Sequence, residues 1–231
     1  SNFIVKPEFT WYLNRSNEVT FGGEFIYYSF EPANAIGITN GDAVDISLPR
    51  KNNGEFSLFA GNSQKISPAV TLEYGLRLSQ FRYFGPGETY TFYDTIPGKR
   101  PRLRDVEAFD KGETIKTYTN LQPRFSFKWQ LSPSASVKGS YNRMVQYLHP
   151  ISNTTASNPL DVWTPSTKNI RPELADQFTL GWFTDLDERR TWEFSVEGYY
   201  RRTQNQVDYI DGADLLINKL LEGDLLVGRG R

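Results

Sequence analysis

The chain has 231 residues and a formal net charge of −1, so its charge gives no electrostatic reason to expect nucleic-acid binding. It contains no cysteine, which excludes a disulfide framework, a thiolate zinc site and a cysteine nucleophile. The mean hydropathy is −0.54, and no apolar run approaches the roughly 18 residues that a transmembrane helix needs. Aromatic residues make up 15% of the chain, a high share for a soluble domain.

Apolar and polar side chains alternate from the start of the chain. In 3–13, Phe9, Trp11 and Leu13 share one parity, and Glu8 lies on the other. This period of two predicts a β-strand with one apolar face. The chain then reads as a turn at 14–17, a strand at 19–30, a long connection over 32–53, a short strand at 56–60, a turn at 62–67, a strand at 70–78 and a long connection over 84–116.

The clearest alternation lies in 117–147. The odd positions from Leu121 to Leu131 are apolar, the even ones are polar, and the apolar parity resumes after a turn at Ser132–Ser134. Each strand has about a dozen residues, which suits a tilted strand crossing a bilayer better than an ordinary strand of about 5–6 residues. The remaining pattern is a long connection over 149–171, a strand at 178–182, a turn at 185–190 and a strand at 192–200.

Short and long connections therefore alternate along the chain, as in an outer-membrane barrel with tight periplasmic turns and long outer loops. Four tryptophans lie near the predicted short turns, and most tyrosines lie toward the long connections, so we expect two aromatic girdles at the membrane interfaces. The girdle tryptophans are Trp11, Trp129, Trp182 and Trp192. The predicted fold is all-β, an antiparallel up-and-down transmembrane β-barrel of which this chain supplies about nine strands.

Several positions depart from this pattern. Arg143 and Met144 break the parity of their strand, through either a bulge or emergence from the membrane. Pro7 and Pro123 each remove a hydrogen-bond donor from a predicted strand. Asp214–Leu221 could be a short amphipathic helix or a ragged strand, and the final VGRGR shows no closing strand.

The segment NIRPELADQFTLGW, Asn169 to Trp182, resembles the N-x-x-x-PE-x-x-x-x-x-x-G stretch of TonB-dependent receptors. The following EFSVEGYYRRTQNQVDYI is similar to their aromatic strand with a polar tail, and LQPR with SYNR is similar to the hairpin before it. The phrase ADLLINKLLEGDLLVGRGR is most similar to Bacteroidetes-type members. The resemblance covers residues 116–231 in the family's order.

This resemblance implies a plugged barrel of about 22 strands in the Gram-negative outer membrane, driven by TonB. Residues 1–231 would be part of one barrel domain, with the plug and the other strands outside this chain, so we expect a fragment. The implied partners are outer-membrane lipid and lipopolysaccharide, TonB acting through the plug, a surface lipoprotein, and a siderophore, cobalamin, glycan or peptide ligand. The resemblance implies no cofactor.

Residues in the long connections are the candidates for ligand binding. A basic cluster could pair with an anionic substrate or with lipopolysaccharide phosphates, or be a solvated loop balanced by acids. Aromatic residues could form a ligand platform or pack the loops together. The candidates are Arg100, Arg102, Arg104, Tyr90, Tyr93 and Trp163. Polar-face residues that we expect to pair across strands or contact a plug are Arg124, Lys128, Glu193, Glu197 and Arg201.

No catalytic or metal site is predicted. The single histidine, His149, lacks a nucleophile and an orienting acid in any sequence motif, so a rim hydrolase is the weaker interpretation. Asp208, Asp211 and Asp214 lack EF-hand spacing. The alternatives to a TonB-dependent importer are another outer-membrane barrel, such as a passive porin or an assembly protein, and a soluble carbohydrate-binding β-sandwich.

Overall fold

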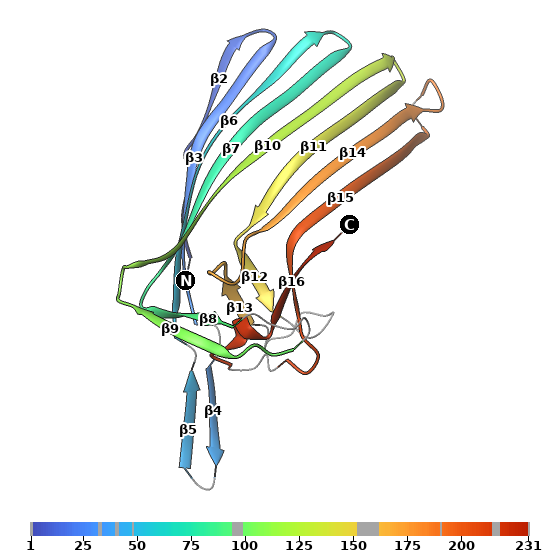
Figure 1. The fold of residues 1–231 in the computed structure, drawn as a ribbon. Coiled ribbons are helices and arrows are strands. Elements are labelled where there is room, and N and C mark those ends of the chain that lie inside the picture. Colours follow the sequence, from blue (N-terminus) through green and yellow to red (C-terminus); the bar gives the residue numbers. More distant parts are fainter. Residues whose placement is uncertain are drawn as a thin grey trace.

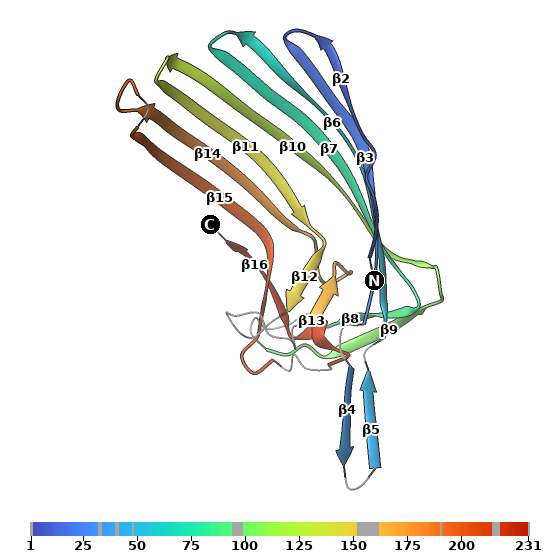
Figure 2. The same cartoon turned by 180° about the vertical axis from the view of Figure 1, so that it is seen from behind.

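The computed structural model describes residues 2–31, 34–39, 42–47, 49–93, 99–151, 162–189, 191–213 and 218–230. Its main feature is one curved, open sheet of ten strands in which all pairs are antiparallel (Figures 1 and 2). The strands follow each other in space nearly as they do along the chain. The sheet consists of β1 (Asn2–Val5), β2 (Glu8–Asn14), β3 (Asn17–Phe30), β6 (Lys51–Ser67), β7 (Val70–Phe84), β10 (Thr114–Ser132), β11 (Ala135–Gln146), β14 (Glu173–Asp185), β15 (Glu193–Tyr209) and β16 (Leu225–Gly230).

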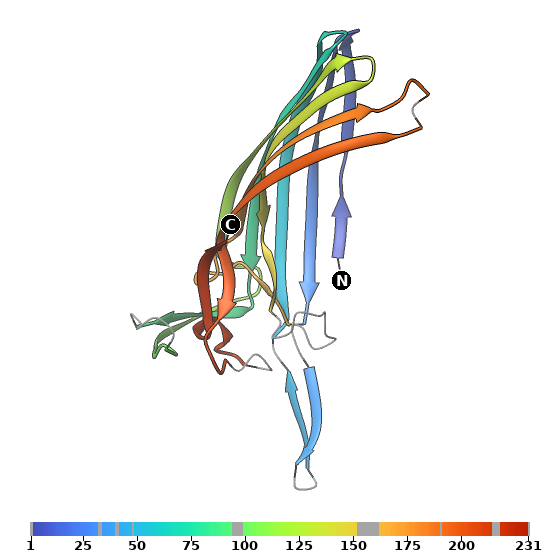
Figure 3. The same ribbon diagram turned by 90° about the vertical axis from the view of Figure 1, so that its right-hand side faces the viewer.

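Short and long connections are sorted to opposite ends of the sheet, as predicted. Tight turns join β2 to β3, β6 to β7, β10 to β11 and β14 to β15 at what we call the short-turn end. Among the described residues, the long-connection end carries three hairpins and one turn of 3-10 helix (Figure 3). These are β4 (Asn34–Thr39) with β5 (Asp42–Ser47), β8 (Gly87–Phe92) with β9 (Leu103–Phe109), β12 (Leu148–Ile151) with β13 (Val162–Pro165), and η1 (Leu221–Gly223).

The sheet has an apolar face and a polar face. Side chains of the predicted apolar parity are exposed to the surroundings of the chain: Phe125 is 41% exposed, Trp129 51% and Val196 57%. They do not turn onto a closed core, so the β-sandwich alternative is wrong. On the polar face Arg77 pairs with Glu24 at 3.2 Å and with Glu55 at 3.6 Å, which links β7 to β3 and β6.

Two strand assignments from the sequence are wrong. The short strand predicted at 56–60 is part of the 17-residue β6. The turn predicted at 62–67 is also strand: residues 62–64 pair with both β3 and β7, and Lys65 and Ser67 pair with β7. The polar run there hides the period of two, but strand pairing still provides partners for its backbone groups. The end of the chain also differs, because β16 pairs with β15 from Thr203 to Tyr209.

Pro7 and Pro123, the two prolines in predicted strands, lie where pairing with one neighbouring strand is interrupted. β1 and β2 both pair with β3 and are separated at Lys6–Pro7, where Gly23 N–H donates to the Pro7 carbonyl at 3.1 Å. A Cβ on Gly22 would lie 2.4 Å from that carbonyl oxygen, so this approach requires glycine. Pro123 stays within β10, and pairing with β11 begins only at the next residue, Arg124.

The parity break at Arg143 is not a bulge, because the β11–β14 register runs without a shift from Ala135 to Gln146. Of the ambiguous 214–221 segment, residues 214–217 lie outside the described residues, and Leu221 begins η1. Among the polar-face charges predicted to pair, Arg201 lies 4.0 Å from Glu173.

Candidate functional site: the loop layer

Segments from three long connections fold together at the long-connection end. We call this assembly the loop layer: the described residues of 85–113, 147–172 and 210–224. It is fastened to the polar face of the sheet by Tyr147, where β11 ends. The Tyr147 hydroxyl lies 2.7 Å from Ser79 Oγ and accepts from Asn120 Nδ2 at 3.0 Å. The Tyr147 ring stacks on Phe81 at 4.9 Å between centroids and 6° between planes.

Phe81 and Tyr147 are the centre of a small apolar cluster. Phe81 is fully buried and Tyr147 is 3% exposed, and both pack with Tyr83. Around them lie the partly buried Ile115, Tyr118 and Val145. The polar face of the sheet therefore carries a buried aromatic anchor at this position, which fixes where the β11–β12 connection turns inward.

The β12–β13 hairpin is held by further hydrogen bonds to the sheet. Tyr118 Oη donates to the Thr167 carbonyl at 2.6 Å, and Lys51 Nζ donates to Thr164 Oγ1 at 3.1 Å. Thr164 and Thr167 are each 1% exposed. The hairpin therefore lies on the polar face as an inward-folded element rather than a freely solvated loop.

His149 belongs to this buried hairpin. It is 2% exposed, and its Nε2 lies 3.1 Å from Oγ of Ser166, which is fully buried. In the described part of the chain no carboxylate bonds to the imidazole, and a buried pair offers no access to a substrate. The pair ties β12 to the segment after β13, so the rim-hydrolase interpretation has no support in this geometry.

Burial lowers the pKa of His149 to about 4 from its usual 6.5. In an opened hairpin His149 would have its usual pKa and would bind a proton at a higher pH than in the folded hairpin. The free energy of opening the hairpin is therefore at its maximum above pH 6.5 and decreases as pH falls toward 4. The difference amounts to about 3 kcal/mol. We expect the protection factors of amides in 147–151, which correct the exchange rates for their intrinsic pH dependence, to fall over this range in the wild type and to stay constant in His149→Gln. Equal pH dependence in both proteins would contradict a buried neutral imidazole.

An ion pair joins two of the long connections. Arg100 donates from Nε and Nη2 to the two carboxylate oxygens of Asp224 at 2.6 and 2.7 Å. Asp224 is 1% exposed, and Asn218 Nδ2 also donates to it at 3.1 Å. Arg100, predicted as a ligand-binding residue, thus has a partner inside the protein.

Asn169 is a second junction. Its Nδ2 donates to the Tyr90 carbonyl at 2.9 Å and to Glu222 Oε2 at 2.5 Å, so one amide touches β8 and η1. Next to it, Lys168 Nζ donates to Thr91 Oγ1 at 2.9 Å. The asparagine that opens the NIRPE stretch therefore has a structural role in assembling the loop layer.

The other predicted ligand-binding residues do not gather in one place. Arg104 lies over the Tyr93 ring at 5.9 Å, and Tyr93 N–H donates to the Arg102 carbonyl at 3.0 Å, so these three exposed residues form one patch between β8 and β9. Tyr90 donates its hydroxyl to Glu88 at 2.9 Å, and burial raises the pKa of Tyr90. Trp163 is 48% exposed, but it lies in the separate hairpin β12–β13.

Sequence reasoning missed the residues that organise this layer, chiefly Asp224, Tyr147, Ser166 and Glu222. Their partners lie far apart in the sequence, as with Arg100 and Asp224, so no local motif could indicate them. The searched part of the chain has no group of three His, Cys, Asp or Glu residues placed to hold a metal. No described helix has the length and hydropathy to cross a membrane.

A family model for the TonB-dependent receptor-like β-barrel matches residues 2–218. The chain belongs to this family. Its strands are therefore part of an outer-membrane β-barrel, and the sheet described above is an unclosed portion of one. No curated protein matches the chain in sequence.

Solved structures with a similar fold include three transport proteins or receptors. The similarity to a copper transporter OprC covers 89% of this chain and 31% of the OprC chain, at 12% sequence identity and a TM-score of 0.61. The FrpB iron transporter from Neisseria meningitidis is 12% identical with a TM-score of 0.57, covering 89% and 29%. A Serratia marcescens hemophore receptor HasR, in complex with its hemophore and heme, is 14% identical with a TM-score of 0.54, covering 90% and 33%.

At these identities the likeness concerns the fold alone, and the chain spans about a third of the length of each structure. In this TonB-dependent receptor barrel, the apolar face is the one that contacts lipid and the polar face lines the lumen. The loop layer then lies at the outer end, because barrels of this class place tight turns on the periplasmic side. All four tryptophans of the predicted girdle are exposed and lie near the short-turn end: Trp11, Trp129, Trp182 and Trp192. Their role as a membrane-interface girdle stays a prediction.

Proposed function

We propose that the chain is the barrel portion of a TonB-dependent outer-membrane receptor that imports a scarce nutrient and catalyses no covalent reaction. The family match over 2–218 is the observation that carries this proposal. In the proposed mechanism, ligand binds at the outer end, and TonB displaces a plug encoded elsewhere in the receptor. The siderophore, cobalamin, glycan and peptide classes and the Bacteroidetes-type subclass belong to this proposal, as does a surface lipoprotein partner.

The loop layer supports a gated pathway over a passive pore. Its hairpin β12–β13 folds onto the lumen face and is fixed there through Tyr147, Tyr118 and Lys51. A passive porin needs an open aqueous lumen, whereas inward-folded segments suit a receptor that holds its ligand before transport. The exposed patch of Tyr93, Arg102 and Arg104 offers an aromatic face and two guanidinium groups to an anionic ligand.

The test is energised uptake in cells that express the full-length receptor. Labelled ferric siderophores, cobalamin, heme, a glycan and a peptide are supplied singly, with and without a protonophore. We expect accumulation of one class, lost on uncoupling, and a drop of about tenfold in its binding in Arg102→Ala/Arg104→Ala. Arg15→Ala, an exposed arginine in a short turn, is the matched control. Uptake that persists after uncoupling would favour a passive porin.

A further inference from the structure

Two lysines lie directly opposite each other on the lumen face, near the short-turn end. Lys128 of β10 pairs with Lys138 of β11, so their side chains share one face of the sheet. That face is opposite the one that carries the lipid-facing Phe125 and Trp129. Both lysines are exposed, and in the described part of the chain no carboxylate lies within ion-pair distance of either ammonium group. Like charges placed directly opposite each other destabilise a sheet, so this pair calls for an anion that the described strands do not supply.

A groove of about 350 Å³ opens on the lumen face around the two lysines. In the same cross-strand row, Gly181 lies next to Lys138 and Glu197 lies next to Gly181. A Cβ on Gly181 would lie 2.8 Å from the Phe183 ring and 3.0 Å from Glu197 Cγ, so both side chains lie directly over this glycine. The other polar residues of the lining are Thr71, Glu73, Ser126, Ser140 and Thr179. The groove therefore presents ammonium, carboxylate and hydroxyl groups to the lumen.

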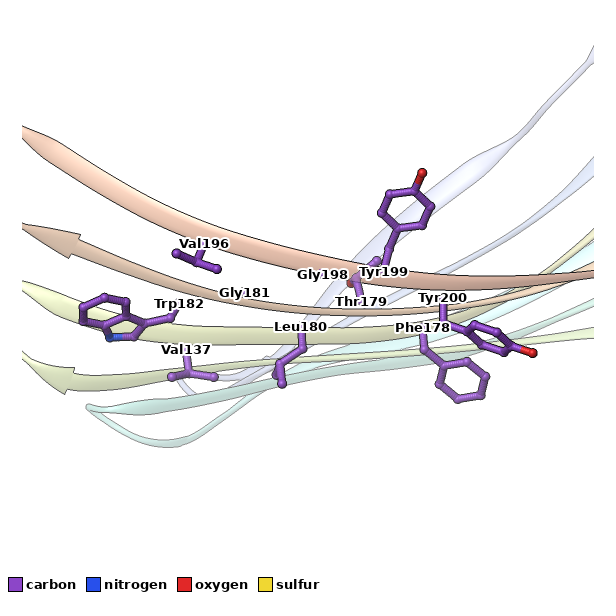
Figure 4. A pocket seen from close by; sticks show the side chains of 10 residues that line it. All are labelled: Val137, Phe178, Thr179, Leu180, Gly181, Trp182, Val196, Gly198, Tyr199 and Tyr200. Atoms are coloured by element: carbon purple, nitrogen blue, oxygen red, sulfur yellow. The ribbon is translucent and has the colours of Figure 1, made fainter. Parts of the chain in front are cut away.

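A row of hydroxyl groups borders the lysines on the side of the long-connection end. It crosses four strands at Ser126, Ser140, Thr179 and Tyr199. Figure 4 shows Tyr199 on the opposite side of the sheet from Phe178 and Tyr200, which belong to the lipid-contacting face. Because paired residues share a face, the whole hydroxyl row lines the lumen beside the lysine pair.

Local contacts position the groups around the lysines. Lys138 Nζ lies 4.3 Å from the centroid of the Phe183 ring, which holds this ammonium group over the groove. Ser126 Oγ donates to Glu73 Oε2 at 3.1 Å, so this carboxylate is bound by a hydroxyl and not by a lysine. Lys128 makes no hydrogen bond, ion pair or ring contact with the described residues. Its ammonium group is therefore free to bind an anion from the lumen.

We propose that Lys128 and Lys138 form a low-affinity site for a phosphate or carboxylate group of the transported ligand, on the inner part of the transport path. This inference rests on the proposed import of an anionic ligand. An anion between the two ammonium groups offsets their mutual repulsion. At the outer end, Arg102 and Arg104 offer planar guanidinium groups that hold an oxyanion through paired, directed hydrogen bonds. Lysines are hydrated point charges on flexible stems, so they bind the same group less specifically.

The charges around the lysine pair suit release of the anion toward the periplasm. Glu73 lies on β7 and Glu197 on β15, on the two sides of the lysine-bearing strands. Their carboxylates repel an anion held between the lysines and so weaken its binding. A transport path needs sites that bind well enough to be entered and weakly enough to be left. Lys128 also lies close to Ser132, where β10 ends at a short turn, so the site is on the periplasmic side of the lumen.

Protection of the two lysines from acetylation tests the site, with pyrophosphate as the probe. The full-length receptor in detergent is treated with an amine-reactive acetylating reagent, and the modified lysines are quantified by mass spectrometry. We expect pyrophosphate to slow acetylation of Lys128 and Lys138 about fivefold, because a bound anion covers the amines and keeps them protonated. Lys111, an exposed lysine in the turn between β9 and β10, should change by less than about twofold. Sodium chloride at equal ionic strength controls for screening.

Matched variants show whether both lysines are needed. In Lys138→Gln, pyrophosphate should protect Lys128 by less than about twofold, whereas Lys111→Gln should leave the protection of Lys128 unchanged. Heat-modifiable migration in gels shows that each variant is folded. Equal protection by sodium chloride would indicate screening alone and would overturn the proposal. Lysines that are already unreactive without pyrophosphate would also overturn it, because another part of the receptor would then occupy the pair.

Uptake separates this inference from the proposed function. The Lys128→Gln/Lys138→Gln receptor is given the same labelled ferric siderophores, cobalamin, heme, glycan and peptide as the wild type. We expect uptake of the accumulated class to fall about fivefold while its binding at the cell surface stays within about twofold. Unchanged uptake by the double variant would overturn the inference alone. Absence of energised uptake by the wild type would contradict the proposed function, and the inference with it.

Discussion

Arg100→Ala is expected to destabilise the described residues of 209–225 by about 3 kcal/mol, because it leaves the buried Asp224 carboxylate without its bidentate partner. Asn218 would then be its remaining side-chain donor among the contacts described. Asp224→Asn should cost less, since the Arg100 side chain is 58% exposed and can be hydrated when the carboxylate is gone. Amide hydrogen exchange of residues 209–213 and 218–225 in the full-length receptor measures both effects.

The matched control is Arg50→Ala. Arg50 makes an ion pair of nearly the same length with Glu31, at 2.5 Å, but those side chains are 62% and 51% exposed. Exposed pairs contribute little because water replaces the lost partner. If the Arg100→Ala and Arg50→Ala variants showed the same exchange rates as the wild type, burial of Asp224 would not hold the loop layer together.

Phe81→Ala is expected to release the loop layer from the lumen face. The substitution removes a fully buried ring and the surface on which Tyr147 stacks, a change that typically costs about 3–5 kcal/mol. The hydroxyl contacts of Tyr147 to Ser79 and Asn120 would then have to hold the connection alone. We expect faster amide exchange from Tyr147 to Ile151 and at Trp163 and Thr164 of β13.

Phe56→Ala is the control for this variant, because Phe56 lies on the apolar face and is 49% exposed. Detergent or lipid can fill the space that its ring leaves, so exchange in β12 should not change. Retention of full protection in Phe81→Ala would show that the hydrogen bonds to Ser79 and Asn120, and not the aromatic stack, fix the hairpin.

The sheet could be predicted from sequence because a barrel strand has two different environments. Lipid on one side and water on the other impose the alternation in β10, where Phe125 and Trp129 are apolar and Arg124 and Lys128 are polar. The prediction failed in β6 from Asn62 to Ser67, because these residues are polar and lie close to the short turn. Strand residues there need not alternate with apolar side chains, since they lie beyond the apolar band of the sheet. It failed again at β16, whose sequence LLVGRG has no clear alternation.

The candidate site was less predictable. The basic residues of the β8–β9 connection look alike in sequence, yet Arg100 is bound to Asp224 while Arg102 and Arg104 stay exposed. What separates them is a partner 124 positions away, which no local pattern contains. The burial of His149 could not be predicted for the same reason, because it depends on a hairpin that folds back onto the sheet.

The sorting of connections to the two ends also constrains how the barrel is assembled. An outer-membrane strand arrives from the periplasm, so the bulky polar segments between strands must cross the bilayer while the tight turns stay behind. Arg100 and Asp224 lie on different connections, and each must make that passage before the two can neutralise each other. Insertion of the strands that flank both connections should therefore precede formation of the Arg100–Asp224 pair in the loop layer.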